Sequence, residues 1–158
     1  MGVHLVTGGS GFVGSHIAEY LVEQGETVHI FDQVPPDVPG TSLRSNCKFI
    51  QGDIRDSKLV SEAVSAADYV YHNIALVPIS RAGNEFWEVN VEGTRTLMQA
   101  ALDTNLKGLV HMSSSAVYDL STTMPITEDT EKDPIGQYGQ SKLDADDVVL
   151  EYADKGVP

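Results

Sequence analysis

The stretch TGGSGFVGSH at residues 7–16 constrains the fold most, because it places several glycines directly after an apolar run. Gly8, Gly11 and Gly14 fit the spacing G-x-x-G-x-x-G, while Gly9, Gly11 and Gly14 fit G-x-G-x-x-G. Glycines between a strand and a helix allow a tight turn, close approach of a ligand and close packing of the helix on the strand. The free amides of that helix would face a pyrophosphate. The stretch therefore predicts a dinucleotide site, with a purely structural turn as the alternative.

Short apolar runs alternate with longer helical patterns along the 158 residues. Strands are predicted at 3–9, 26–32, 47–53, 68–77 and 106–114, and helices at 12–25, 56–67, 84–105 and 136–156. The helix at 56–67 is expected to begin with an Asp or Ser cap. This alternation is typical of βαβ units. It predicts one α/β domain over residues 1–158, a Rossmann-type doubly wound parallel sheet in the order 3-2-1-4-5 with helices on both faces. The prolines in 33–46 predict a loop or a broken short helix there.

Asp32 ends the second predicted strand. In dinucleotide-binding folds, an acidic residue about 20 residues after the glycines in the sequence binds the adenosine ribose, and Asp32 lies near that position. Its carboxylate would accept hydrogen bonds from both ribose hydroxyls and would repel a 2′-phosphate. No Arg or Lys follows Asp32 until Arg44, which favours NAD over NADP. The alternative is a solvated aspartate at a strand end.

Charge and composition exclude several classes of partner. The formal net charge of −13 would repel nucleic acid and anionic membranes. No apolar run approaches the roughly 20 residues of a membrane helix, and the N-terminus lacks the basic region of a signal peptide, so a cytoplasmic location is expected. Cys47, the single cysteine, can form neither an internal disulfide nor a zinc site, and no metal is expected.

Tyr138 and Lys142, in the stretch YGQSK, would lie on one face of the last predicted helix. A nearby ammonium favours the phenolate, so Lys142 could prepare Tyr138 for proton transfer. The serines of HMSSSAVY, residues 111–118, follow the fifth predicted strand, at the edge where ligands bind in open α/β sheets. A serine hydroxyl there could bond the substrate oxygen whose proton Tyr138 transfers. Without this context, the Tyr–Lys pair would be an ordinary surface pair.

Taken together, these residues resemble the extended short-chain dehydrogenases/reductases, in particular the NAD-dependent nucleotide-sugar epimerases and dehydratases. The match occurs in family order and spacing over almost the whole chain. It is carried by TGGSGFVGSH, Asp32, GDIRD (52–56), HNIA (72–75), NVEGT (90–94), SSSAVY (113–118), PITED (125–129) and YGQSK (138–142).

The resemblance implies roles for the residues at matching positions. Tyr138 would be the acid/base, Lys142 would bind the nicotinamide ribose and tune Tyr138, and Ser114, with Ser115 as the alternative, would supply the partner hydroxyl. The cofactor-binding residues implied are Gly8, Gly11, Phe12, Val13 and Gly14 at the pyrophosphate, Asp32 at the ribose, Asp53 and Ile54 beside the adenine, and Ile74 and Ala75 in the cleft. Asn90 would support the loop after the fourth strand.

Departures from the family pattern narrow the expected function. Dehydratases usually carry an Asp-Glu pair where this chain has Ser115 and Ala116, which disfavours a dehydratase. Asp119 follows Tyr118 where glycine is common. Family members are also longer, and their remaining part supplies the next strand and the domain that grips the nucleotide-sugar.

The resemblance thus implies an NAD-dependent epimerase or dehydrogenase that acts on a nucleotide-sugar. Two alternatives stay open: an NAD-binding module or catalytically incomplete fragment, and a reductase or hydroxysteroid-type dehydrogenase on the same scaffold. In such families, helices corresponding to 84–105 and 136–154 pair across a dimer. A homodimer is therefore expected, and an exposed apolar stripe on those helices would support it.

Overall fold

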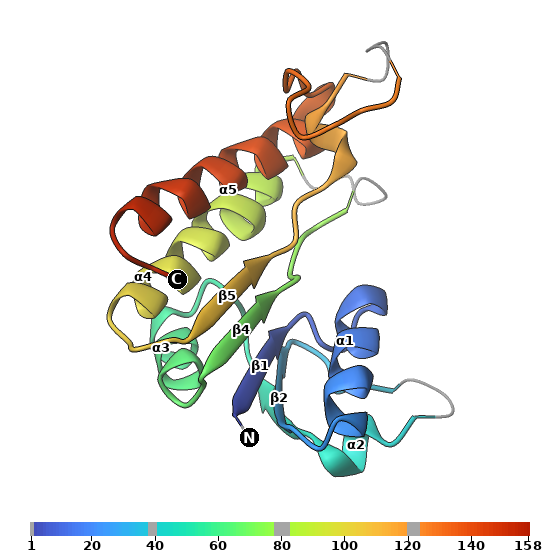
Figure 1. Ribbon diagram of the computed structural model, residues 1–158, viewed down its shortest axis with the longest axis vertical. Coiled ribbons are helices and arrows are strands. Elements are labelled where there is room, and N and C mark those ends of the chain that lie inside the picture. Colours follow the sequence, from blue (N-terminus) through green and yellow to red (C-terminus); the bar gives the residue numbers. More distant parts are fainter. Residues whose placement is uncertain (1, 38–40, 78–82, 120–123) are drawn as a thin grey trace.

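The computed structural model describes residues 2–37, 41–77, 83–119 and 124–158. Its five strands form one parallel sheet in the order β3-β2-β1-β4-β5, which confirms the predicted doubly wound α/β fold (Figure 1). The strands are β1 (Val3–Thr7), β2 (Thr27–Asp32), β3 (Lys48–Gln51), β4 (Tyr69–His72) and β5 (Gly108–His111).

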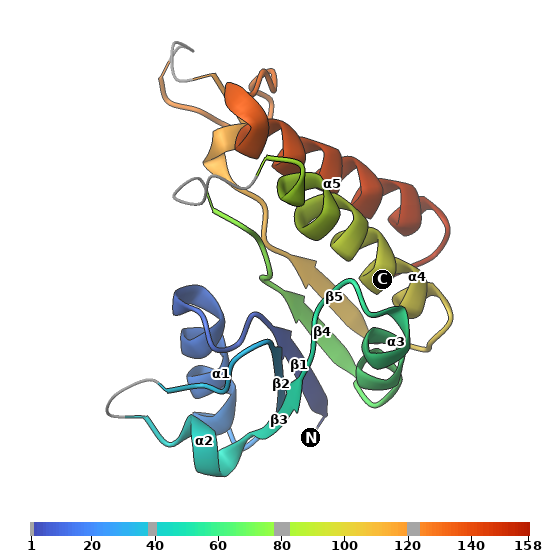
Figure 2. The ribbon, with the colours of Figure 1, turned by 180° about the vertical axis from the view of Figure 1, so that it is seen from behind.

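Helices cover both faces of this sheet (Figures 1 and 2). The first face carries α1 (Phe12–Glu23) and α2 (Leu43–Asn46), and the second carries α3 (Ser57–Ser65), α4 (Gly93–Leu102) and α5 (Gly136–Asp154). Neighbouring strand residues point to opposite faces, so the two cores draw on alternate positions. Val6 and Ile30 belong to the core on the α1 side, whereas Leu5 and Phe31 belong to the core on the α4 side. No helix among the described residues is long and apolar enough to span a membrane.

The fifth strand, predicted over 106–114, is shorter in the structure, and two other predicted elements differ in ways that side-chain contacts explain. β4 ends at His72, although the apolar run continues to residue 77, because the Asn90 side chain bonds the backbone of Leu76 and holds it out of the sheet. The predicted helix over 84–105 begins as a π-helix, η1 (Trp87–Glu92), before it continues as α4. In an α-helix, the Asn90 carbonyl would accept a hydrogen bond from the Thr94 amide. Here that carbonyl accepts from the Thr94 hydroxyl, at 2.6 Å.

Two shorter predictions agree with the described residues. The α3 helix has Asp56 as its N-cap, whose carboxylate accepts from the amides of Lys58 and Leu59, both at 3.1 Å. Within 33–46, the chain forms the four-residue helix α2, and residues 38–40 lie outside the described part.

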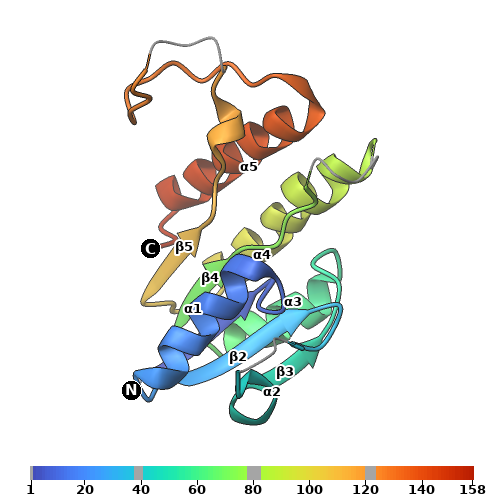
Figure 3. The same ribbon diagram turned by 90° about the vertical axis from the view of Figure 1, so that its right-hand side faces the viewer.

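The parallel arrangement brings the carboxyl ends of all strands to one edge of the sheet. The turn between β1 and α1, the loop after β4, the 3-10 helix η2 (Ser115–Val117) and the start of α5 all lie there (Figures 1 and 3). Segments that carry chemistry-bearing residues far apart in the sequence therefore meet at this edge.

Candidate functional site

The glycine turn joins the end of β1 directly to the start of α1. Gly8 has a φ of 68°, a left-handed conformation that other residues rarely adopt, and its amide donates to the Phe31 carbonyl at 2.9 Å. A Cβ at Gly14 would overlap the Gly8 carbonyl oxygen. Glycine at these two positions is what lets the helix start against the turn.

The start of α1 offers free backbone amides to a ligand. Its N-cap, Gly11, makes no side-chain cap bond, and the Ser15 amide makes the first helical hydrogen bond, to the Gly11 carbonyl at 2.9 Å. The amides of Phe12, Val13 and Gly14 precede that bond and point out of the helix end. The Phe12 side chain is 83% exposed. This arrangement suits an anion such as a pyrophosphate.

Asp32 lies at the end of β2, beside the glycine turn. Its half-buried carboxylate accepts from the Ser10 amide at 3.1 Å and from the Gln33 amide at 2.7 Å. The carboxylate therefore fixes the turn to β2. The Val34 amide donates to the carboxylate as well, at 3.4 Å, so about one of the roughly four acceptor sites on its two oxygens remains for a ligand hydroxyl.

Asp53 and Ile54 follow β3, and only the first presents a polar side chain. Asp53 accepts from Arg55 Nη2 at 2.7 Å and from Gln33 Nε2 at 3.0 Å. The Arg55 hydrogen bonds hold the pKa of Asp53 below its ordinary value. The Ile54 side chain is 2% exposed and packs where a Cβ on Gly93 would be, so only its backbone can meet a ligand.

The loop after β4 lies against the glycine turn, and Asn90 holds it. A Cβ on Gly8 would lie 3.1 Å from the Ile74 amide nitrogen, and both Ile74 and Ala75 are half-buried. Asn90 is 1% exposed, and its Oδ1 accepts from the Leu76 amide at 2.7 Å. The structure therefore places Asn90 where it can set the position of this loop.

Lys142 is buried under the end of β5. Its side chain is 2% exposed, and Nζ donates to the Met112 carbonyl at 2.8 Å. Burial lowers the pKa of the Lys142 ammonium, and the Asp146 carboxylate opposes this effect. Two of the three ammonium protons lie outside the Met112 bond, so this group can still donate to a ligand.

The first turn of α5, which carries Tyr138, packs on η2, which Ser114 begins. A Cβ on Gly139 would overlap the Ala116 carbonyl, so the two backbones are in contact. The Tyr138 ring is half-buried, with its centroid 6.0 Å from that of Phe86. The Ser114 hydroxyl accepts from the Ala116 amide at 3.2 Å and begins η2. Among the described residues, no hydrogen bond joins the Tyr138 hydroxyl to Ser114 or Lys142.

A cleft of about 420 Å³ opens at the carboxyl end of β5. It is lined by Met112, Ser113, Ser114, Ser115, Val117, Tyr118, Lys132 and Asp146. Four hydroxyls, one ammonium and one carboxylate suit a ligand rich in hydroxyl groups. Ser114 thus lies in this cleft, whereas Tyr138 and Lys142 lie outside its lining.

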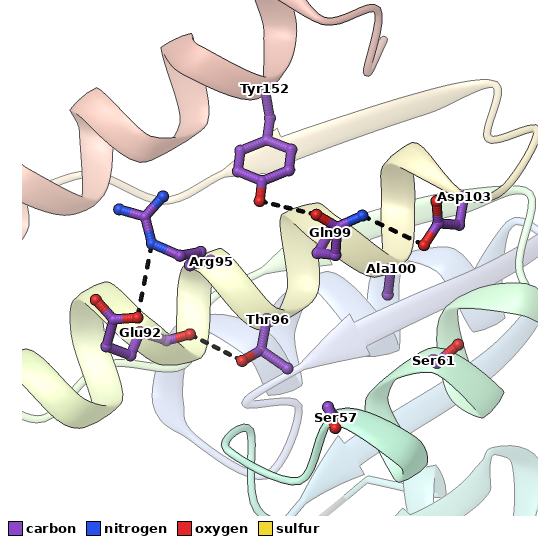
Figure 4. Close-up of a pocket in the computed structure, with 9 residues that line it drawn as sticks. All are labelled: Ser57, Ser61, Glu92, Arg95, Thr96, Gln99, Ala100, Asp103 and Tyr152. Carbon is purple, nitrogen blue, oxygen red and sulfur yellow. Dashed lines mark hydrogen bonds and ion pairs between the residues drawn. The ribbon is translucent and has the colours of Figure 1, made fainter.

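A second groove of about 420 Å³ lies among α3, α4 and α5, in the outer layer of helices (Figure 4). Its polar groups bond one another. The Tyr152 hydroxyl donates to Gln99 Oε1 at 3.1 Å, Gln99 Nε2 donates to Asp103 at 3.3 Å, and Arg95 pairs with Glu92 at 3.6 Å. With these groups already partnered, the groove is a weaker candidate site than the carboxyl edge.

Sequence reasoning gave no role to several buried polar residues that the structure places beside this site. His72 and Thr94 are each 1% exposed, and Ser141 is fully buried. All three lie within the stretches HNIA, NVEGT and YGQSK. A buried polar side chain needs a hydrogen-bond partner. Polar residues inside otherwise apolar helix and strand patterns were therefore the sequence signal that could have identified these three residues.

Comparison with known proteins places this geometry in a family. Residues 4–157 match the model of the NAD dependent epimerase/dehydratase family. A UDP-glucose 4-epimerase of Lactobacillus helveticus is 38% identical over 156 residues, which are 96% of this chain and 47% of that protein. A dTDP-D-glucose 4,6-dehydratase of Mus musculus is 35% identical over 161 residues, 94% of this chain and 45% of that protein.

Solved structures show the same likeness. A short-chain dehydrogenase/reductase superfamily protein from Agrobacterium tumefaciens with bound NAD superposes with a TM-score of 0.87 at 32% identity, covering 98% of this chain and 46% of that one. The chain thus spans about half the length of these relatives. On the family match and on this fold, the chain belongs to the NAD-dependent epimerase/dehydratase family.

Proposed function

We propose that this chain forms the NAD-binding part of an enzyme that epimerises or dehydrogenates a nucleotide-sugar. The observation that carries the proposal is the meeting, at one sheet edge, of the glycine turn beside Asp32 and the helix that bears Tyr138 and Lys142. The family match and the UDP-glucose 4-epimerases among the relatives support this class of cofactor and substrate.

The residues of the turn fit NAD. The amides of Phe12 and Val13 would hold the pyrophosphate, in a cradle that a side chain on Gly14 would fill. Asp32 would accept from the adenosine ribose hydroxyls. The Asp53 carboxylate and the Ile54 backbone would border the adenine, and Ile74 and Ala75 would line the cleft toward the nicotinamide. Bound NAD supplies a group that accepts and returns a hydride.

The chain's own residues would handle the proton. Tyr138 would take the proton of a sugar hydroxyl as the carbon loses its hydride, and it would return that proton when the carbonyl is reduced. Lys142, anchored at the Met112 carbonyl, would offer its other N–H groups to the nicotinamide ribose and favour the Tyr138 phenolate. The Ser114 hydroxyl would bond the substrate oxygen.

The residues beside Ser114 favour epimerase or dehydrogenase chemistry within this family. Elimination of water needs an acid to protonate the leaving hydroxyl and a base to remove a carbon-bound proton. Ser115 and Ala116 follow Ser114, and neither carries a carboxylic acid. We therefore favour an epimerase or a dehydrogenase over a dehydratase.

The test has a binding part and a turnover part. Calorimetric titration with NAD and with NADP should show tight binding of NAD and much weaker binding of NADP. In the full-length protein, Tyr138→Phe should lower turnover of UDP-glucose by about 10²- to 10⁴-fold and leave the Kd for NAD unchanged. Tyr20→Phe, on the exposed face of α1, is the matched control. Normal turnover by Tyr138→Phe would contradict the proposal. NAD binding without conversion of any nucleotide-sugar would favour a binding module.

A further inference from the structure

A connected set of buried polar side chains runs from the glycine turn to the helix that carries Tyr138. We call it the buried polar network, and its members are Thr7, His72, Asn90, Thr94 and Ser141. Each is at most 1% exposed. Together they link β1, β4, η1, α4 and α5. A buried network is costly unless its members are paired, and each of these side chains has a hydrogen-bond partner.

The first half of the network joins β1 to the helix η1–α4. Thr7 Oγ1 lies 2.8 Å from His72 Nδ1, and His72 Nε2 lies 3.0 Å from Thr94 Oγ1. Thr94 uses its single hydroxyl proton on the Asn90 carbonyl, so it must accept from His72 Nε2–H. His72 Nδ1 must then accept from Thr7. Burial holds the pKa of His72 well below its ordinary value, in agreement with a neutral ring of one fixed tautomer.

The second half joins the loop after β4 to α5. The amide group of Asn90 donates to the Leu76 carbonyl at 3.2 Å and to Ser141 Oγ at 3.0 Å. Ser141 Oγ donates in turn to the Tyr138 carbonyl at 2.8 Å. The Ser141 hydroxyl is therefore the point at which the network holds the first turn of α5, between Tyr138 and Lys142.

We propose that Ser141 is a positioning residue that fixes Tyr138 relative to the cofactor cleft. This inference rests on the proposed function, in which Tyr138 moves the substrate proton. On the exposed side of the same turn, Gln137 and Gln140 contact solvent, and the Gln140 side chain donates to Asp144 rather than to a backbone group of Tyr138. Loss of the Ser141 hydroxyl would leave the Asn90 amide short of one acceptor and release the Tyr138 carbonyl from its side-chain partner.

The experiment uses Ser141→Ala in the full-length protein, with UDP-glucose and NAD as the probes. We expect kcat to fall by about 10- to 100-fold, the cost of a small misplacement of a reacting group, while the Kd for NAD stays within about twofold. Hydrogen exchange of the amides of residues 138–142 should become faster. In an Asn90→Ala background, the further effect of Ser141→Ala on kcat should largely disappear.

The control is Thr104→Ala, which removes a similar bond from a hydroxyl to the carbonyl three residues earlier, that of Ala101, in the turn that follows α4. It should change neither kcat nor the exchange of 138–142. Unchanged exchange in Ser141→Ala would overturn the inference whatever the substrate. Equal losses of kcat and NAD affinity would also overturn it, because they indicate a general structural role. If Tyr138→Phe retains full turnover, the proposed function itself has failed.

Discussion

The two sides of the proposed cofactor cleft are fixed by different kinds of contact. On the side of the glycine turn, backbone groups dominate: the Gly8 amide bonds the Phe31 carbonyl, and the Ser10 amide bonds Asp32. On the side of α5, buried side chains dominate, as in the bonds of Lys142 to Met112 and of Asn90 to Ser141. The first side is therefore specified by local spacing, and the second by partners far apart in the chain.

The substitution expected to disrupt the glycine turn most is Gly14→Ala. The added methyl would overlap the Gly8 carbonyl, so either α1 or the turn must move. We expect NAD affinity to fall on the order of 100-fold or more, with a lower Tm, because the amides that hold the pyrophosphate are displaced. Calorimetric titration and thermal unfolding measure both effects. Gly108→Ala is the control, since its methyl would meet only the Tyr69 ring at 3.3 Å. Parental affinity in Gly14→Ala would contradict the assigned site.

A smaller change on the same side is Asp32→Ala. Hydrogen bonds from a ligand to a charged group contribute about 1.5–3 kcal/mol, so NAD affinity should fall about 10-fold or more. Binding of NADP should change less, and the preference for NAD should narrow, because the repelling carboxylate is gone. Parallel titrations with both cofactors measure the ratio. An unchanged ratio would show that Asp32 only fixes the turn through the Ser10 and Gln33 amides.

The Asp53–Arg55 pair tests a more exposed part of the same side. Because Arg55 depresses the pKa of Asp53 from its ordinary 3.8, the pair adds stability above that value and loses it as pH falls through the lowered pKa. Arg55→Met removes this pair together with the Arg55–Glu88 pair at 3.2 Å, and it should cost about 0.2–1 kcal/mol per pair at neutral pH, as for other exposed pairs. The difference in unfolding free energy from the parent should shrink below about pH 4. A cost that stays constant between pH 7 and the acid limit would exclude this ion pair as its source.

The expected homodimer would form through the outer surface of α4 and α5. Leu150 is the one large exposed apolar side chain on α4 and α5 in the part of the chain that the structure describes, and Glu92, Asp147 and Glu151 are exposed there. The apolar stripe that would support a dimer is therefore not seen among these residues. Two such acidic faces would repel, so we expect a dimer through them to strengthen from about 50 to 500 mM salt. Sedimentation of the full-length protein measures this. A dimer that weakens with salt would point to another surface.

The sequence predicted the side of the glycine turn better than the side of α5. The strand order, the turn at Gly8 to Gly14 and the cap at Asp56 follow from spacing and local propensity, and the structure has each of them. The early end of β4 and the partner of Lys142 were not predicted. They depend on contacts such as that of Asn90 with Leu76 and that of Lys142 with Met112, which no local pattern reveals.

Because η1 is a π-helix, the number of residues between 86 and 92 determines which way the side chains before it face. A wider turn accommodates one residue more than an α-helix over the same rise, so deleting a single residue could restore the regular pitch without unfolding the helix. An insertion or deletion that left the wider turn in place would instead rotate everything before it by about 100° around the axis. Trp87 would leave Asp144, to which its indole donates at 2.9 Å, and Phe86 would leave the Tyr138 ring. Insertions and deletions between residues 86 and 92 should therefore be rarer among functional relatives than substitutions there.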